Sequence, residues 1–148
     1  MAGASGKTQA QPARAATTVA LVANERSGSS DPELCAARLR SCGARVERFD
    51  IEDVQRAVEA GADRVVVAGG DGSIAPVAAA AGALGVPVAV VPSGTANDFA
   101  HRLGLPQELS AACRLAVRGT SFRELELGWL EAAGERRPFV NVARSLGR

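Results

Sequence analysis

The sequence predicts an α/β fold, a doubly wound and mostly parallel sheet with helices on both of its faces. Three observations support this prediction. Short apolar runs alternate with segments of helical character, and three of the runs end in polar, glycine-containing loops. Hydrophobic residues make up 47% of the chain and charged residues 22%, which is typical of a globular domain with a buried core. Because strand–helix–strand alternation joins strands by crossovers, we expect the strands to lie parallel.

The predicted strands differ in how apolar they are. The first, third and fourth are short runs rich in valine and alanine, as expected for strands that are covered on both faces. The second carries several charged side chains, so we expect it nearer an edge of the sheet. The four strands are expected at residues 17–23, 45–51, 64–68 and 86–91, and later strand-like pieces at residues 122–130 and 138–142, with a turn at residues 133–135.

The helices between these strands are predicted from their end signals. Asp31 can cap a helix that continues through Pro32, because aspartate accepts main-chain N–H groups and proline fits the first turn. Gly43 and Gly61 are expected to end the first two helices. The helices are expected at residues 31–43, 54–61, 74–84 and 107–118, with a further one that begins at residue 96 or 97.

The length of 148 residues corresponds to one domain. Residues 1–16 lack the apolar stretch of a secretory signal, so we expect a disordered tail there and the domain over residues 17–148. The 16 arginines and single lysine balance 16 acidic residues without a basic stripe, which argues against nucleic-acid binding. No apolar run reaches the roughly 18–20 residues of a membrane span, so no transmembrane segment is expected.

The cysteines argue against a zinc site. Cys35, Cys42 and Cys113 form no C-x-x-C pair, and His101 is the single histidine. An odd, widely spaced set of cysteines without a signal peptide is typical of reduced thiols in a cytoplasm. Cys35 and Cys42 fall on one predicted helical face, where we expect them to pack into the core.

The first loop with chemical potential is Gly69-Gly70-Asp71-Gly72-Ser73. Glycines let a main chain approach a ligand, and the N-terminus of the following helix favours phosphate. The Ser73 hydroxyl can donate to a phosphate oxygen or cap the helix. The Asp71 carboxylate would repel a phosphate unless Mg²⁺ lies between them or the carboxylate orients a water or hydroxyl, and either use belongs to phosphoryl transfer. The alternative, a tight turn in which aspartate serves the turn, stays open.

Two further polar loops should reach the same edge of the sheet. Residues 92–98 offer Gly94, the Thr95 hydroxyl, Asn97 and Asp98, although Asn97 and Asp98 are also common helix caps. If Asp98 faces the loop after the third strand, two carboxylates would form a site for a hydrated metal. Ligands of parallel sheets bind where the strands end at their carboxyl ends. The remaining loop supplies Asn24, Ser27 and Gly28.

Together these loops resemble the catalytic domain of bacterial diacylglycerol kinases and related lipid kinases, a superfamily that includes sphingosine kinases and, more distantly, NAD kinases. The family pattern is N-P-x-S-G, then G-G-D-G-T, then P-x-G-T-x-N-D-F-A-R-x-L-G-x-P. Residues 24–28 read N-E-R-S-G, residues 69–73 read G-G-D-G-S, and residues 92–106 follow the third pattern closely. The resemblance covers residues 17–147.

The resemblance implies ATP and Mg²⁺ as cofactors, and Asp71 and Asp98 as catalytic residues that hold a Mg²⁺–water network. Glu126 stands where the family has an aspartate that joins this network. Ser73 replaces a threonine and keeps the hydroxyl. The implied nucleotide-binding residues are Asn24, Ser27, Gly28, Gly69, Gly70, Asp71, Gly72, Ser73, Gly94, Thr95 and Asn97.

By the same resemblance, the activity is transfer of the ATP γ-phosphoryl group to a lipid hydroxyl such as that of diacylglycerol, in phospholipid metabolism. The partners are a nucleotide and a lipid at the membrane surface, the location is cytoplasmic or peripheral to the membrane, and homodimerisation stays open. Relatives carry a second, β-rich domain, and we expect this chain to end before it and to have weak or no activity alone. Two alternatives remain: a non-catalytic nucleotide-binding fragment or partner-dependent half, and an NAD kinase-like enzyme.

Overall fold

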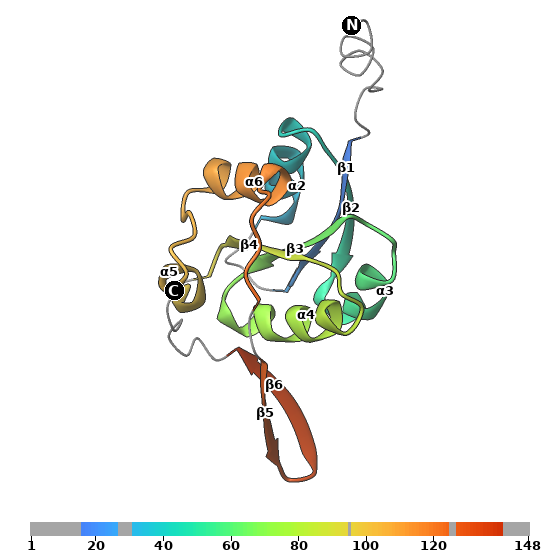
Figure 1. The fold of residues 1–148 in the computed structure, drawn as a ribbon, viewed down its shortest axis with the longest axis vertical. Coiled ribbons are helices and arrows are strands. Elements are labelled where there is room, and N and C mark those ends of the chain that lie inside the picture. The colour runs from blue at the N-terminus through green and yellow to red at the C-terminus, as the bar shows by residue number, and fades with distance from the viewer. Residues whose placement is uncertain (1–15, 27–30, 95, 125–126, 141–148) are drawn as a thin grey trace, which may run out of the picture.

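A four-stranded sheet organises the chain, as the computed structural model shows for residues 16–26, 31–94, 96–124 and 127–140. The strands are β1 (Thr17–Ala23), β2 (Ala44–Asp50), β3 (Arg64–Gly69) and β4 (Val88–Pro92), in the order β2-β1-β3-β4. All three strand pairs are parallel. The predicted parallel α/β fold is therefore confirmed (Figure 1).

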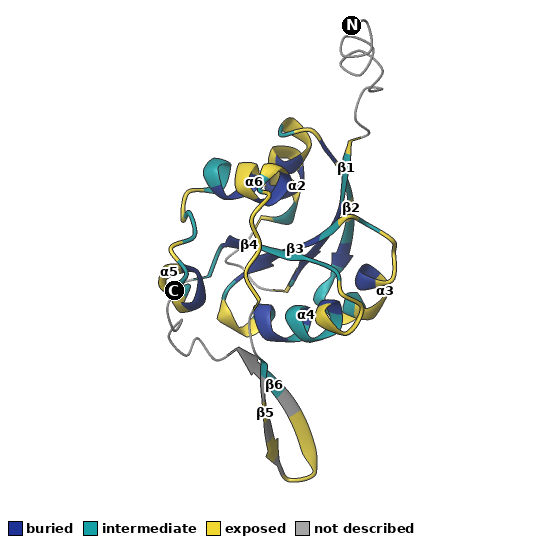
Figure 2. Cartoon of the chain, in the orientation of Figure 1, coloured by how far each residue is buried: buried dark blue, intermediate teal, exposed yellow. Residues whose placement is uncertain are grey.

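Helices cover both faces of the sheet because alternate side chains of each strand point to opposite sides. Val19, Leu21 and Ala23 of β1 pack in one core cluster, and Ala20 and Val22 pack in the other. The helices are α2 (Pro32–Ser41), α3 (Val54–Val58), α4 (Asp71–Ala83), α5 (Asp98–Arg102) and α6 (Leu109–Arg118), with a 3-10 turn at Ile51–Asp53. The first cluster includes side chains of α2 and α6, and the second includes side chains of α3, α4 and α5. Helices α2 and α6 lie on one side of the sheet, and α3 and α4 lie on the other (Figure 2).

The start of α2 matches the sequence prediction in atomic detail. The Asp31 carboxylate accepts a hydrogen bond from Leu34 N at 3.1 Å, and Pro32 occupies the first helical position. Gly43, with φ of +103°, follows the end of the helix, in the left-handed region that glycine tolerates best. The second helix is shorter than predicted, because residues 51–53 form a 3-10 turn and α3 ends at Val58.

The other helix boundaries differ from the prediction at the polar loops. Helix α4 begins at Asp71 instead of Ile74, and Gly70 is its N-cap residue. Ser73 therefore lies inside the first turn and does not cap the helix, contrary to that alternative. Helix α5 begins at Asp98, so Asp98 is the first helical residue rather than a cap. At the first of these loops the glycine-rich sequence obscured a helix that only Gly70 separates from β3, whereas residues 93–97 separate α5 from β4.

The late strands form an antiparallel hairpin, β5 (Leu127–Ala132) and β6 (Glu135–Val140), that projects past α4 (Figure 1). The predicted strand ranges were displaced, since residues 119–124 form no strand. The two-residue turn at Ala133 and Gly134 fixes this register, because both residues have positive φ, +54° and +79°. In the described residues, no helix is long and apolar enough to cross a membrane.

Two of the cysteines meet although they are far apart in the sequence. Cys35 of α2 and Cys113 of α6 are buried in the same core cluster, and all three cysteines are free thiols. The hydrogen bond that the Cys35 thiol donates to Cys113, together with burial, raises the pKa of Cys35 well above its ordinary value. The predicted core role of Cys35 is confirmed, while Cys42 is half-buried beside the core.

Candidate functional site

The strand register brings the polar loops to one edge of the sheet. Ala23 at the end of β1 pairs with Asp50 of β2 and with Ala68 of β3, and Gly69 pairs with Pro92 at the end of β4. Four strands therefore end at nearly the same level, which we call the carboxyl edge. The segments that follow β1, β3 and β4 all begin there, as the sequence predicted.

The loops after β3 and β4 touch each other through two glycines. A Cβ atom built on Gly94 would lie 2.7 Å from Gly70 Cα, and one built on Gly70 would lie 3.1 Å from Gly94 Cα. Real Cβ atoms essentially never come as close as the first of these distances. Gly70 and Gly94 are therefore required for the two main chains to meet. A Cβ on Gly72, by contrast, would contact nothing within 4 Å.

Asp71 joins these two loops by hydrogen bonds. Its Oδ2 accepts from Asp98 N at 2.9 Å and its Oδ1 accepts from Phe99 N at 3.0 Å. Asp71 thus satisfies main-chain N–H groups at the start of α5, as a capping residue would, although it lies on another element. The local alternative, an aspartate that serves only its own turn, is therefore wrong. Asp71 and Asp98 lie side by side in space, and both are exposed.

Asn97 closes the loop after β4 on itself. Its Oδ1 accepts from Gly94 N at 2.9 Å, and its Nδ2 donates to Gly94 O at 3.0 Å. Asn97 occupies the N-cap position of α5 in a left-handed conformation, with φ of +52°, but its side chain makes no capping hydrogen bond. The side-chain capping role considered for Asn97 is therefore wrong, and its amide instead shapes the loop.

Hydroxyl groups lie beside the glycine contact. Gly69 is buried, its carbonyl accepts from Ser93 N at 3.1 Å, and a Cβ there would approach Ser73 Oγ to 3.1 Å. Ser93 Oγ is buried and has no hydrogen-bond partner among the residues that the structure describes. The Ser73 hydroxyl lies in the first turn of α4, where the unpaired N–H groups and dipole of a long helix favour an anion.

The loop after β1 is held from the end of β2. Asn24 Oδ1 accepts from Arg26 N at 3.1 Å, and Asp50 Oδ1 accepts from Glu25 N at 3.1 Å. Main-chain N–H groups of Glu52 and then Glu25 lower the pKa of Asp50 below its ordinary value. Asp50 was not among the site residues that the sequence predicts. Its position as the last residue of a charged strand, next to a polar loop, was the available signal.

The predicted site residues fall into two groups. The structure brings together Gly69, Gly70, Asp71, Gly72, Ser73, Gly94, Asn97 and Asp98, with Asn24 at the same edge of the sheet. Ser27, Gly28, Thr95 and Glu126 lie outside the described residues. Within the described ranges, no group of three His, Cys, Asp or Glu side chains could hold a metal ion. Asp71 and Asp98 are exposed aspartates joined by the hydrogen bond from Asp98 N to Asp71 Oδ2.

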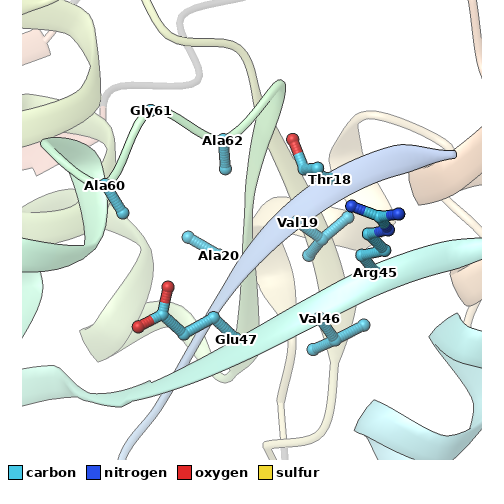
Figure 3. A pocket seen from close by; sticks show the side chains of 9 residues that line it. All are labelled: Thr18, Val19, Ala20, Arg45, Val46, Glu47, Ala60, Gly61 and Ala62. Carbon is cyan, nitrogen blue, oxygen red and sulfur yellow. The ribbon is translucent and has the colours of Figure 1, made fainter. Parts of the chain in front are cut away.

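A small pocket of about 250 Å³ lies elsewhere, between β1, β2 and residues 60–62 (Figure 3). Methyl groups of Ala60 and Ala62 line one side of it, and the charged side chains of Arg45 and Glu47 lie on the other (Figure 3). None of the predicted site residues lines this pocket. The candidate site is instead the set of contacting loops at the carboxyl edge.

Known proteins share this fold and these sequence features. A family profile described as "Diacylglycerol kinase catalytic domain" matches residues 18–129. "Probable lipid kinase YegS-like" of Klebsiella pneumoniae is 35% identical over 127 residues, which cover 78% of this chain and 41% of that protein. "Probable lipid kinase YegS" of Salmonella dublin is 31% identical and covers 83% of this chain and 44% of its own length.

A crystal structure of a diacylglycerol kinase from Bacillus anthracis superimposes with a TM-score of 0.56 at 22% identity, over 83% of this chain and 46% of that one. This likeness supports the fold. The family match spans well over half of the chain and includes every predicted site residue. The chain belongs to the diacylglycerol kinase catalytic domain family, and thus to the lipid kinases. It spans about two fifths of the length of these curated relatives.

Proposed function

We propose that this chain is the nucleotide-binding part of a lipid kinase that transfers the γ-phosphoryl group of ATP, with Mg²⁺, to a lipid hydroxyl such as that of diacylglycerol. The observation that carries the proposal is the Asp71 carboxylate, which ties the two glycine loops together beside the N-terminus of α4. A backbone cradle, a helix N-terminus and a carboxylate pair are the parts that phosphoryl transfer uses for positioning and charge neutralisation.

The charges at the carboxyl edge fit a hydrated cation. Asp71 and Asp98 are both exposed, and a triphosphate placed beside them would be repelled without a positive ion. Mg²⁺ keeps several of its waters and needs few protein carboxylates, so a pair that acts through water suits it better than a three-residue cage. When bound, Mg²⁺ would neutralise charge on the phosphates. The residues that would hold it are Asp71 and Asp98, with Glu126 proposed from the family pattern.

The main chain would contact the phosphates. Gly72 in the first turn of α4 has no neighbour within 4 Å of a built Cβ, so a ligand can approach its backbone closely. The Ser73 hydroxyl can donate to a phosphate oxygen, and the positive end of the 13-residue α4 favours the same charge. Gly94 and Asn97 hold the facing loop in place, so the cradle is formed before a ligand binds.

Lipid phosphorylation by these 148 residues alone should be weak, because the curated relatives are more than twice as long. Nucleotide binding is therefore the more direct test. We expect ATP to bind in the presence of Mg²⁺ and to bind much more weakly in EDTA, as measured by isothermal titration calorimetry. Asp71→Asn should reduce the Mg²⁺-dependent affinity by about tenfold, since a neutral amide attracts a hydrated cation less than a carboxylate does.

Asp63→Asn is the matched control for that substitution. Asp63 is an exposed carboxylate that also accepts a main-chain N–H, but it lies at the other edge of the sheet. The affinity of the Asp63→Asn variant for ATP should equal that of the unsubstituted protein. A phosphorylation assay that offers NAD and diacylglycerol side by side separates the lipid kinase from the NAD kinase-like alternative. Absence of any ATP binding with Mg²⁺ present would contradict the proposal.

A further inference from the structure

Asp50 connects three segments at the carboxyl edge. It is the last residue of β2, opposite Ala23 at the end of β1. Its Oδ1 accepts from Glu25 N at 3.1 Å, and its Oδ2 accepts from Glu52 N at 2.9 Å. One carboxylate therefore fixes the loop that follows β1 and caps the 3-10 turn that follows β2.

Arg48 of β2 binds acidic side chains at both ends of the segment that joins β1 to α2. Arg48 Nη1 donates to Glu33 Oε1 at 2.7 Å, in the first turn of α2, and Arg48 Nη2 donates to Glu25 Oε2 at 3.4 Å. Arg26 and Glu52 form an ion pair at 3.1 Å, with side chains that are 80% and 62% exposed. Ion pairs this exposed contribute little, so the Asp50 bonds to the main chain hold the loop more firmly.

We propose that Asp50 is a positioning residue for nucleotide binding, which acts by fixing Glu25 N–H and thereby placing Asn24 at the carboxyl edge. The inference rests on the proposed function, because it assumes that the nucleotide binds at this edge. Asp50 acts through the loop rather than on the ligand for two reasons. Its oxygens bind the main chain of residues 25 and 52, and none of its recorded hydrogen bonds reaches the glycine loops after β3 and β4, where the phosphates are proposed to bind.

Asp63 offers a close control within the same chain. Its Oδ2 accepts from Thr18 N at 2.9 Å and from Thr18 Oγ1 at 3.1 Å, so it joins the starts of β3 and β1. The two aspartates share their residue type and their bonding to the main chain of another segment, although Asp50 is partly buried and Asp63 is exposed. They differ in the edge of the sheet at which they lie.

The test compares the full chain with Asp50→Ala, Asp50→Asn and Asp63→Ala, by ATP titration with Mg²⁺ and by thermal unfolding. Asp50→Ala and Asp63→Ala should lower the melting temperature to a similar extent. Asp50→Ala should also weaken ATP binding by about tenfold, the size of one lost hydrogen bond to a charged group. Asp63→Ala should leave affinity unchanged, and Asp50→Asn, which keeps one acceptor oxygen, should restore part of it.

Amide hydrogen exchange at Glu25 is a second readout, and it should be faster in Asp50→Ala and unchanged in Asp63→Ala. If Asp50→Ala does not fold, Asp50→Asn carries the comparison. Equal ATP affinity in the unsubstituted chain and both Asp50 variants would overturn the inference while the proposed function stands. An unsubstituted chain that binds no nucleotide would overturn both.

Discussion

Aspartate carboxylates accept main-chain N–H groups both at the amino edge of the sheet, where the strands begin, and at the carboxyl edge. They join different elements at the two edges. At the amino edge, Asp63 bonds the start of β3 to Thr18 of β1, and Arg64 donates to Ala116 O at 2.7 Å and Gly119 O at 2.6 Å at the end of α6. At the carboxyl edge, Asp50 and Asp71 accept N–H groups from loops. The amino edge therefore secures strands and helix ends, whereas the carboxyl edge secures the relative placement of loops.

This contrast teaches where function should be sensitive. Changes at the amino edge should cost stability alone, whereas changes at the carboxyl edge should cost nucleotide binding as well. The carboxyl edge also tolerates side chains less, since the loops meet through bare glycine backbones. The following substitutions test the contrast in order of decreasing effect on stability.

Gly94→Ala should have the largest effect. Its Cβ would lie 2.7 Å from Gly70 Cα, and main chain on both sides prevents simple relief. We expect a loss of about 3 kcal/mol in the free energy of unfolding, measured by urea denaturation, together with loss of Mg²⁺-dependent ATP binding. Gly72→Ala is the matched control, because its Cβ meets open space in a helical turn and should leave stability equal or higher. Normal ATP affinity in Gly94→Ala would show that the loop contact does not shape the site.

Arg64→Ala tests the amino edge. The substitution removes two part-buried hydrogen bonds to carbonyls and the stacking of the guanidinium on Phe122, 5.4 Å from the ring centroid. We expect a loss of about 2 kcal/mol in the free energy of unfolding. ATP affinity should stay unchanged. Arg114→Ala is the control, because Arg114 is an exposed arginine on α6, the helix whose end Arg64 binds. It should have little effect on the free energy of unfolding or on ATP affinity. Reduced ATP affinity in Arg64→Ala would contradict the division of roles between the edges.

Asp71→Ala and Asp98→Ala separate the two carboxylates of the candidate site. Asp71 accepts hydrogen bonds from two main-chain N–H groups. Its removal should therefore lower the free energy of unfolding, measured by urea denaturation, by about 1 kcal/mol. Asp98 contributes its main-chain N–H to that contact, and the alanine variant keeps it, so stability should change by less than about 0.5 kcal/mol. Both variants should bind ATP with Mg²⁺ more weakly. A purely structural role for the pair predicts unchanged binding in Asp98→Ala.

Acid sensitivity should be the smallest effect and should be shared by both edges. Main-chain N–H groups of Glu52 and Glu25 lower the pKa of Asp50, and the N–H and then the hydroxyl of Thr18 lower the pKa of Asp63. Each group therefore stabilises the fold above its unfolded pKa of about 3.9, and this contribution is lost as the pH falls through the lower, folded pKa. When the pH is lowered from neutral, the melting temperature should begin to decrease at about pH 4. The double variant Asp50→Asn, Asp63→Asn should show a shallower fall.

Local signals in the sequence were sufficient for part of this structure. Valine-rich runs indicated the buried strands, and the Asp31 cap with Pro32 marked the start of α2 correctly. These features depend on neighbouring residues and on burial that hydrophobicity reports directly. The convergence of the loops was also predictable, because parallel strands end at a common edge.

The contacts between distant segments could not be predicted from the pattern. Asp71 bonds to main-chain atoms of residues 98 and 99, and Cys35 meets Cys113, so neither pairing leaves a local trace in the sequence. The start of α4 was predicted three residues late because Gly70 and Gly72 are typical of loops, yet the helix dipole and the carboxylate contact favour a start at Asp71. Asp50 was missed because its partners are main-chain N–H groups, which every residue but proline carries.

The position of β1 between β2 and β3 affects the order in which the strands can pair during folding. Thr17 pairs with Ala44 and Val19 pairs with Arg64, so both partners of β1 come later in the sequence. During synthesis β1 therefore emerges before β2 and β3 and remains unpaired until they follow. Its run of valine, alanine and leucine is of the kind that aggregates when exposed. Long-range parallel pairing is slow to form, so the rate at which β3 becomes available should govern how much nascent chain reaches the native state.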